Sequence, residues 1–276
     1  MNGTRDVPGQ HLKDIAPAEQ AMNPPVALTV AGSDPSGGAG IAADLTTFAA
    51  LGVHGTAVIT AVTAQNTVGV QGVHPIPADF VARQLDSVLD DLPVAAVKTG
   101  MLANGEIIAV VGEYAAAGRL PNLVVDPVMV SSTGARLLDA GTEALYLELL
   151  QYATVATPNA RETMVLGEVG EFDEPAHLAA LCPGWFVMTG QVTATEWIHH
   201  DGGWSELPGE VIDTANDHGT GCTFSAVVAV ALAAGVAPMD AIVSAKMFVR
   251  NCLERSAEWD LGAGRGPVAH LMEPEL

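Results

Sequence analysis

The chain contains few residues of several kinds, and each shortage excludes a class of protein. Only three of its 276 residues are cysteines, namely Cys182, Cys222 and Cys252. They form no Cys-x-x-Cys pair, so we expect neither a disulfide framework nor a zinc site built from paired thiolates. Aromatic residues make up only 5% of the chain. Valine, leucine, isoleucine and alanine must therefore build the core.

Basic residues are also scarce, with 11 lysines and arginines against 32 aspartates and glutamates, which gives a formal charge of −21. This charge argues against nucleic acid and anionic membranes as partners. No apolar run is long enough to cross a membrane, and the first residues do not resemble a signal peptide, so we expect a cytoplasmic protein. Any bound ATP would need a locally electropositive site, formed by backbone amides and a divalent cation.

The order of apolar and polar segments indicates the fold class. Residues 1–24 are polar, contain three prolines and show no periodicity, so we expect a disordered leader before a single domain over residues 25–276. Strands and helices then alternate, which predicts an α/β fold with a mostly parallel central sheet and helices on both faces. The expected strands are VALTVA, TAVITAVTAQN, VAAVKTG, NLVVDP, ATVATPN and GWFVMTG, and WIHHDGGWSEL is expected to be a hairpin turning at Asp201 and Gly202. We expect TAVITAVTAQN to be one strand covered on both faces.

Polar residues follow each expected strand of the parallel sheet, where such sheets bind ligands. The stretch NDHGTGCTFS, residues 216–225, is the most informative. Gly219 and Gly221 permit turn conformations that are closed to other residues, and the apolar run that follows predicts a buried helix. The free N–H groups at such a helix start bind phosphate, and a thiol there, Cys222, should ionise more easily than a free cysteine. The alternative is a capping turn beside a buried cysteine.

Two other groups of residues are candidates for the same edge of the sheet. Asn159 and Glu162 lie three residues apart in TPNARE and offer oxygen ligands for Mg²⁺, with Asp126 as a third. The same spacing also fits a helix capping box. Gln65 either reads the edge of a heterocycle or caps a strand.

Four further residues have less decided roles. Asp44 faces either the pocket or solvent, and burial statistics favour solvent. Met101 is either a pocket wall or core, and Lys98, at the end of a strand, is expected to form a salt bridge by default. His218 lies four residues before Cys222, but we do not expect a Cys–His nucleophile because the surrounding glycines favour an anion site.

Six motifs of the chain are AGSDPSGGAGIAADLTTFAALG, VITAVTAQNT, KTGML, VVDPVMVSSTG, TPNARE and HGTGCT. In order and spacing they resemble those of the bacterial hydroxymethylpyrimidine/phosphomethylpyrimidine kinases of thiamine biosynthesis, which are ribokinase-like. The resemblance covers residues 26–258. It implies that ATP, with Mg²⁺, phosphorylates 4-amino-5-hydroxymethyl-2-methylpyrimidine and then its monophosphate, usually in a homodimer.

The resemblance also implies roles for individual residues. The pyrimidine would be bound by Gln65, Asp44, Gly32, Met101 and Val128. The anion site would be Gly219, Thr220 and Gly221, with Cys222 as the base. The nucleotide phosphates would lie near Asp126, Asn159, Glu162 and Thr189, with Asn159 and Glu162 at the metal.

Three departures from the family pattern affect the nucleotide side. Gln191 replaces a glycine and the histidine after it is missing, Ala215 replaces a common lysine, and Asp217 replaces a threonine. The last two changes make the anion site less positive, so they predict weaker nucleotide binding. The alternatives are a pyridoxine or pyridoxal kinase and a pyrimidine-binding regulatory protein with weakened catalysis.

Overall fold

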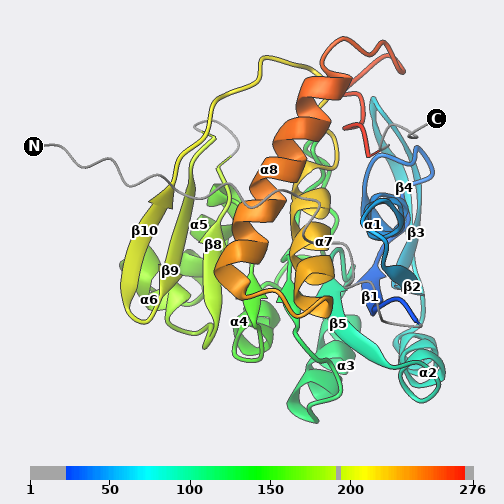
Figure 1. Cartoon of the computed structure of the whole chain (residues 1–276). Helices are drawn as coiled ribbons and strands as arrows, with labels where there is room; N and C mark the ends of the chain where they lie inside the picture. Colours follow the sequence, from blue (N-terminus) through cyan, green and yellow to red (C-terminus); the bar gives the residue numbers. More distant parts are fainter. Residues whose placement is uncertain (1–22, 191–193, 271–276) are drawn as a thin grey trace, which may run out of the picture.

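A computed structural model describes residues 23–190 and 194–270. The expected leader, apart from its last two residues, and Gln191 lie outside these ranges. The centre of the fold is one sheet (Figure 1). Across the sheet the strands are β10 (Gly203–Leu207), β9 (Glu196–His200), β8 (Trp185–Met188), β7 (Val155–Ala156), β6 (Val124–Val125), β5 (Val94–Thr99), β1 (Val26–Ala31) and β2 (His54–Ile59). The pairs from β2 to β8 are parallel, and β9 and β10 pair antiparallel. The predicted mostly parallel sheet is confirmed.

Helices cover both faces of the sheet, as predicted (Figure 1). One face packs against α1 (Gly40–Ala50), α7 (Thr220–Ala233) and α8 (Pro238–Ser256); the other packs against α2 (Ala78–Leu89), α3 (Gly105–Ala116), α4 (Ala144–Leu150), α5 (Ala160–Val169) and α6 (Pro175–Ala179). Strand side chains alternate between the two faces of the sheet, so neighbouring residues pack in different cores. Ala27 of β1 packs in the core that contains α7, and Leu28 packs in the core on the opposite face, which contains α2 to α6. Within the described ranges, no helix is long and apolar enough to cross a membrane.

The helix that follows the glycine turn is buried along most of its length. Every residue of α7 from Thr223 to Leu232 is buried. A helix with no polar face belongs inside a protein, so the apolar sequence of this stretch explains its position. The hairpin is also confirmed, with its turn at Asp201 and Gly202, whose φ angles are 49° and 76°.

The expected strand TAVITAVTAQN is two strands, which corrects the prediction of one strand covered on both faces. The chain leaves the central sheet at Thr60, whose hydroxyl donates to the carbonyl of Met101 at 2.6 Å. Strand β3 (Ala61–Asn66) then pairs antiparallel with β4 (Gly69–Pro75) in a separate two-stranded sheet. Alternate residues of β3, such as Val62, are exposed. Gln65 therefore lies on this flap and not on the edge of the central sheet.

Candidate active site

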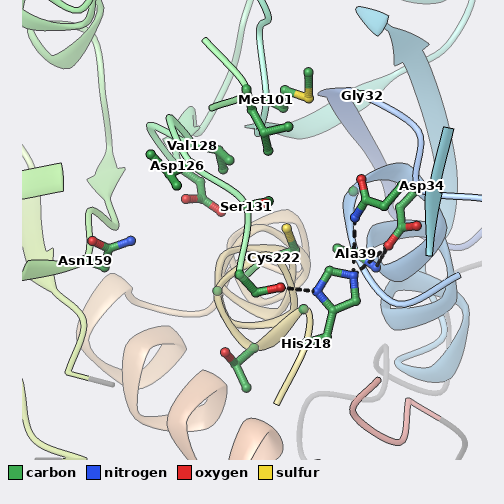
Figure 2. Close-up of a pocket in the computed structure, with 18 of the residues that line it drawn as sticks. Gly32, Asp34, Ala39, Met101, Asp126, Val128, Ser131, Asn159, His218 and Cys222 are labelled. Carbon is green, nitrogen blue, oxygen red and sulfur yellow. Dashed lines mark hydrogen bonds and ion pairs between the residues drawn. The ribbon is translucent and has the colours of Figure 1, made fainter. Parts of the chain in front are cut away.

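Two cavities meet at the N-terminus of α7, beyond the carboxyl ends of the central strands. Their volumes are about 360 and 380 Å³. The first is bordered by the GSDPSGG loop, the β3–β4 flap and the loop after β6 (Figure 2). The second extends to α8 and β10. Residues that line both cavities are Asp126, Asn159, Glu162, Asp217, Thr220 and Gly221. A group bound in one cavity can therefore reach a group bound in the other.

The expected site residues are distributed over both cavities. Those in the first only are Gly32, Gln65, Met101, Val128, Gly219 and Cys222. Thr189 lines the second, and its N–H donates to the carbonyl of Pro158 at 2.9 Å. Asp44 belongs to neither lining.

The two glycines before α7 have different roles. Gly219 has φ of 90°, and a Cβ there would lie 1.9 Å from the carbonyl oxygen of Gly38. Glycine is therefore required for this turn to pack against the loop before α1. Gly221 is already helical, and a Cβ there would meet nothing within 4 Å. The expectation of a special turn conformation at Gly221 was wrong, and its missing side chain leaves open space between the two cavities.

Cys222 lies at the base of the first cavity, between Asp126 and His218 in the view of Figure 2. Burial raises the pKa of its thiol to about 12, although the positive charge of Lys98 opposes this shift. The negative charges of Asp44 and Asp126 add to the increase. The expectation of an easily ionised thiol was therefore wrong, because desolvation outweighs the helix N-terminus.

Lys98 and Asp44 form a fully buried ion pair beneath the cavity floor. Lys98 Nζ lies 2.9 Å from Asp44 Oδ2, and Thr29 also donates to that oxygen, at 2.6 Å. Burial lowers the pKa of Lys98, but the charges of Asp44, Cys222 and Asp126 outweigh it and raise the pKa above its usual value. The predicted salt bridge of Lys98 is confirmed, and the expectation that Asp44 faces solvent was wrong.

Asn159 and Glu162 form the capping box of α5. Asn159 Oδ1 accepts from the N–H of Glu162, and Glu162 Oε2 accepts from the N–H of Asn159, each at 2.9 Å. The side chains also line both cavities, so this local role leaves them beside the α7 N-terminus.

Two buried carboxyl groups, those of Asp126 and Glu162, line both cavities. Burial raises the pKa of Glu162 to about 8, with the charge of Asp126 adding to it, and burial raises the pKa of Asp126 to about 6. The described residues include no cluster of three or more acidic, histidine or cysteine side chains arranged for a metal. Two carboxylates with an adjacent amide fit Mg²⁺, because that ion keeps several waters when it binds proteins.

A polar network along one wall of the first cavity was not foreseen. His218 Nε2 lies 2.7 Å from Asp34 Oδ2, and His218 Nδ1 lies 2.7 Å from Ser132 Oγ (Figure 2). Burial raises the pKa of Asp34, but hydrogen bonds from His218 and Ser36 outweigh it and leave that pKa below its usual value. Both ring nitrogens of His218 are engaged away from Cys222, in agreement with the rejection of a Cys–His nucleophile.

Comparison with known proteins decides the family. Residues 34–269 match the family described as phosphomethylpyrimidine kinase. The chain belongs to the phosphomethylpyrimidine kinase family. It is 43% identical over 262 residues to the hydroxymethylpyrimidine/phosphomethylpyrimidine kinase of Synechococcus elongatus, covering 91% of this chain and 98% of that one. It is 44% identical over 261 residues to the Streptomyces coelicolor enzyme of the same name, covering 90% and 95%.

Solved structures confirm the ribokinase-like fold expected for a phosphomethylpyrimidine kinase. An ADP complex of Bacillus subtilis pyridoxal kinase matches with a TM-score of 0.80 and 35% identity, covering 90% of this chain and 98% of that one. The phosphomethylpyrimidine kinase of Clostridium difficile matches with a TM-score of 0.71 and 33% identity, covering 83% and 99%.

The charge at the anion site of this phosphomethylpyrimidine kinase differs from the expectation based on Asp217. The carboxylate of Asp217 is paired with Arg265, whose Nε lies 2.7 Å from Asp217 Oδ1. Arg161 also lines the first cavity, and no ion pair of the described residues involves it. The structure therefore brings two arginines to a site expected to have lost positive charge: Arg161 from the motif TPNARE and Arg265 from outside the quoted motifs.

Proposed function

We propose that this phosphomethylpyrimidine kinase transfers the γ-phosphoryl group of ATP to the hydroxymethyl group of 4-amino-5-hydroxymethyl-2-methylpyrimidine, and then phosphorylates the resulting monophosphate. One observation carries the proposal: the N-terminus of α7 lies where the two cavities meet, and Gly221 leaves space there. A phosphoryl group at this point would lie against free N–H groups while the two substrates occupy separate cavities.

The first cavity has the dimensions and the chemistry for the pyrimidine. Gln65 offers both donors and an acceptor to the ring edge, and Met101 and Val128 offer apolar surface. Gly32 sets the width of the cavity, because a Cβ there would lie 2.9 Å from Met101 Sδ. The second cavity, with Thr189 and the α8 side chains, would hold the nucleotide.

Transfer requires the charge on the phosphates to be balanced. Thr220 and Gly221 line both cavities at the start of α7; the N–H of Thr220 donates to the carbonyl of Asp217 at 3.3 Å, whereas the described contacts give the N–H of Gly221 no acceptor outside the helix. The N–H dipoles of this first turn would stabilise the developing charge without reorganising. Asp126, Asn159 and Glu162 would hold Mg²⁺. When bound, the ion would neutralise phosphate charge and orient the γ-phosphoryl group.

Cys222 is the proposed base for the alcohol. In the free protein its thiol is protonated at neutral pH, given its pKa of about 12. The charge of Lys98 lowers the pKa of this thiol and so favours the thiolate, whereas its partner Asp44 raises that pKa. Proton transfer from the hydroxymethyl group to Cys222 would then accompany phosphoryl transfer.

The deciding experiment is an ATP-consumption assay with purified protein. It should use the pyrimidine alcohol and its monophosphate in turn, with and without Mg²⁺. We expect turnover of both compounds that requires Mg²⁺. Tight binding of the pyrimidine with no turnover would instead indicate a regulatory protein.

Pyridoxal is the second candidate substrate, because the Bacillus subtilis structure that matches with a TM-score of 0.80 is a pyridoxal kinase. The ratio of kcat/KM for pyridoxal to that for the pyrimidine alcohol distinguishes the two. We expect the pyrimidine to be preferred.

We propose that the protein acts in the cytoplasm as a homodimer, with a single kinase domain over residues 25–276. The β3–β4 flap supports the dimer, because Val62, Val68 and Val73 are exposed on it. A second copy of the chain would cover these side chains. Light scattering of the purified protein gives the oligomeric state directly.

A further inference from the structure

Arg265 lies in the segment that follows α8 and returns to the mouth of the first cavity. Its backbone N–H donates to the carbonyl of Thr67, in the turn between β3 and β4, at 3.0 Å. Its guanidinium donates to both carboxylate oxygens of Asp217 and to the carbonyl oxygen of Ser132, the latter at 2.8 Å. One side chain thus connects the C-terminal segment, the approach to α7 and the loop after β6.

The glycines around Arg265 explain why it occupies this position. A Cβ at Gly264 would lie 2.1 Å from the carbonyl oxygen of Thr67, and a Cβ at Gly266 would lie 1.8 Å from Asn216 Oδ1. The segment GAGRGP can therefore pack closely against both neighbours only with glycine on each side of Arg265. This close packing fixes the backbone from which the arginine reaches the cavity.

Ser132 belongs to a tight turn, residues 130–136, that lines the first cavity. The turn is closed by the Ser131 N–H donating to Ala135 and by a bridge between Val130 and Arg136. Two contacts tie Ser132 across the cavity: its carbonyl oxygen accepts from Arg265, and its hydroxyl lies 2.7 Å from His218 Nδ1. The position of the 130–136 turn over the cavity thus depends on residues from the far end of the chain.

We infer that Arg265 is a positioning residue for the pyrimidine: paired with Asp217, it holds the 130–136 turn over the first cavity. The expected effect on the KM for the pyrimidine rests on the proposed function, whereas the effect on the position of the 130–136 turn does not. Arg265 also balances the charge of Asp217, which lines both cavities beside Thr220 and Gly221. The fork of the guanidinium allows both tasks at once, because its N–H groups point in fixed, separate directions.

Substitution of Arg265 by lysine separates the two tasks. In Arg265→Lys the positive charge beside Asp217 is kept, but an ammonium cannot reproduce the fork that also reaches Ser132. We expect the KM for the pyrimidine to rise about tenfold, as for one lost charge-assisted hydrogen bond, while kcat and the KM for ATP change by less than about twofold. In Arg265→Ala, the unbalanced Asp217 should raise the KM for ATP as well. An unchanged pyrimidine KM in Arg265→Lys would overturn the inference.

Hydrogen exchange of the free protein tests the structural part without any substrate. We expect amides of residues 130–136 to exchange faster in both Arg265 variants than in the unsubstituted protein. Arg119→Ala is the matched control, because Arg119 also pairs with carboxylates, Asp86 and Asp90, yet lines neither cavity. Unchanged exchange in the Arg265 variants would refute the inference even if the kinase activity is confirmed. Faster exchange in a protein that lacks turnover would support the inference and refute the proposed function.

Discussion

At the scale of single residues, Cys222 shows two opposing effects on one thiol. The α7 N-terminus and Lys98 favour the thiolate, whereas burial and the carboxylates of Asp44 and Asp126 favour the thiol. Burial is the largest of these effects, so the free enzyme holds a protonated cysteine. A base with this property should be recognisable by its pH dependence.

We predict that Cys222→Ala lowers kcat by about 10²- to 10⁴-fold, the usual contribution of general base catalysis, with little change in pyrimidine affinity. In the unsubstituted enzyme, kcat/KM should rise with pH between about 6 and 9, because the thiolate fraction grows up to the pKa of about 12. Steady-state kinetics across this range are the measurement. Cys252→Ala is the control, because Cys252 is a buried thiol on α8 that lines neither cavity. Undiminished kcat in Cys222→Ala would remove the base assignment.

Alanine substitutions at Gly221 and Gly219 give a second test at the scale of single residues. Gly221→Ala should leave the melting temperature unchanged or slightly higher, because its Cβ meets nothing within 4 Å and alanine favours a helix by up to about 1 kcal/mol. The methyl group would occupy the phosphate position, so kcat/KM should fall at least about tenfold. Gly219→Ala should instead lower the melting temperature, because its Cβ would lie 1.9 Å from Gly38 O. Full activity of Gly221→Ala would show that the phosphate lies elsewhere.

At the scale of elements, the β3–β4 flap determines the shape of the first cavity. Thr63 on β3 donates to the carbonyl of Ser33 at 2.8 Å, which ties the flap to the loop before α1. Gln65 follows an irregularity in the β3–β4 register between Ala64 and Gln65, and its Oε1 accepts from the hydroxyl of Thr63 at 3.3 Å, so the two side chains lie together. The flap thus brings Gln65 within 3.5 Å of His218, 153 residues further along the chain.

We predict that Gln65→Ala weakens pyrimidine binding about tenfold, as expected for one or two lost hydrogen bonds, and leaves kcat nearly unchanged. Isothermal calorimetry with the pyrimidine alcohol is the measurement. The control is Gln71→Ala, since Gln71 is exposed on the same flap and lines neither cavity. Equal affinities for Gln65→Ala and the unsubstituted protein would exclude Gln65 from ring recognition.

At the scale of the whole molecule, a protein of formal charge −21 has to bind an anionic nucleotide. In the proposed function this repulsion is overcome locally, by the amides at the start of α7, by the pairing of Asp217 with Arg265 and by Arg161 at the cavity wall. Surface charges further away than about 10 Å are screened at physiological salt, so they oppose binding weakly. The few basic residues therefore matter by position and not by number.

Global stability should depend on pH through His270. Burial, with the charge of His218 adding to it, lowers the pKa of His270 to about 4 from 6.5 in the unfolded chain. The unfolded state then binds more protons between these values, so the contribution of His270 is complete above pH 6.5 and is lost as pH falls towards 4.

We predict that lowering the pH from 7 to 5 reduces the unfolding free energy of the unsubstituted protein by about 2 kcal/mol more than that of His270→Asn. Urea denaturation of both proteins at the two pH values is the measurement. A difference that does not vary with pH would mean that His270 titrates alike in the folded and unfolded chains.

The sequence by itself determined the alternation of helices and strands and the start of the buried helix α7 after the glycine turn. These features are local: a glycine turn, an apolar run or a capping pair such as Asn159 and Glu162 acts within a few residues. The departure of β3 from the sheet was missed, because the apolar pattern of TAVITAVTAQN fits a buried strand and only the contact of Thr60 with Met101 marks the break.

Only the tertiary structure decided how the site residues ionise and which charges they meet. Cys222 is protonated because packing excludes water, Asp44 is buried because Lys98 lies opposite it 54 residues away, and Asp217 is neutralised by Arg265 from 48 residues away. Such pairs have no fixed spacing in sequence. Their electrostatic energy depends on separation in space and on the surrounding dielectric, and both arise only when the chain has folded.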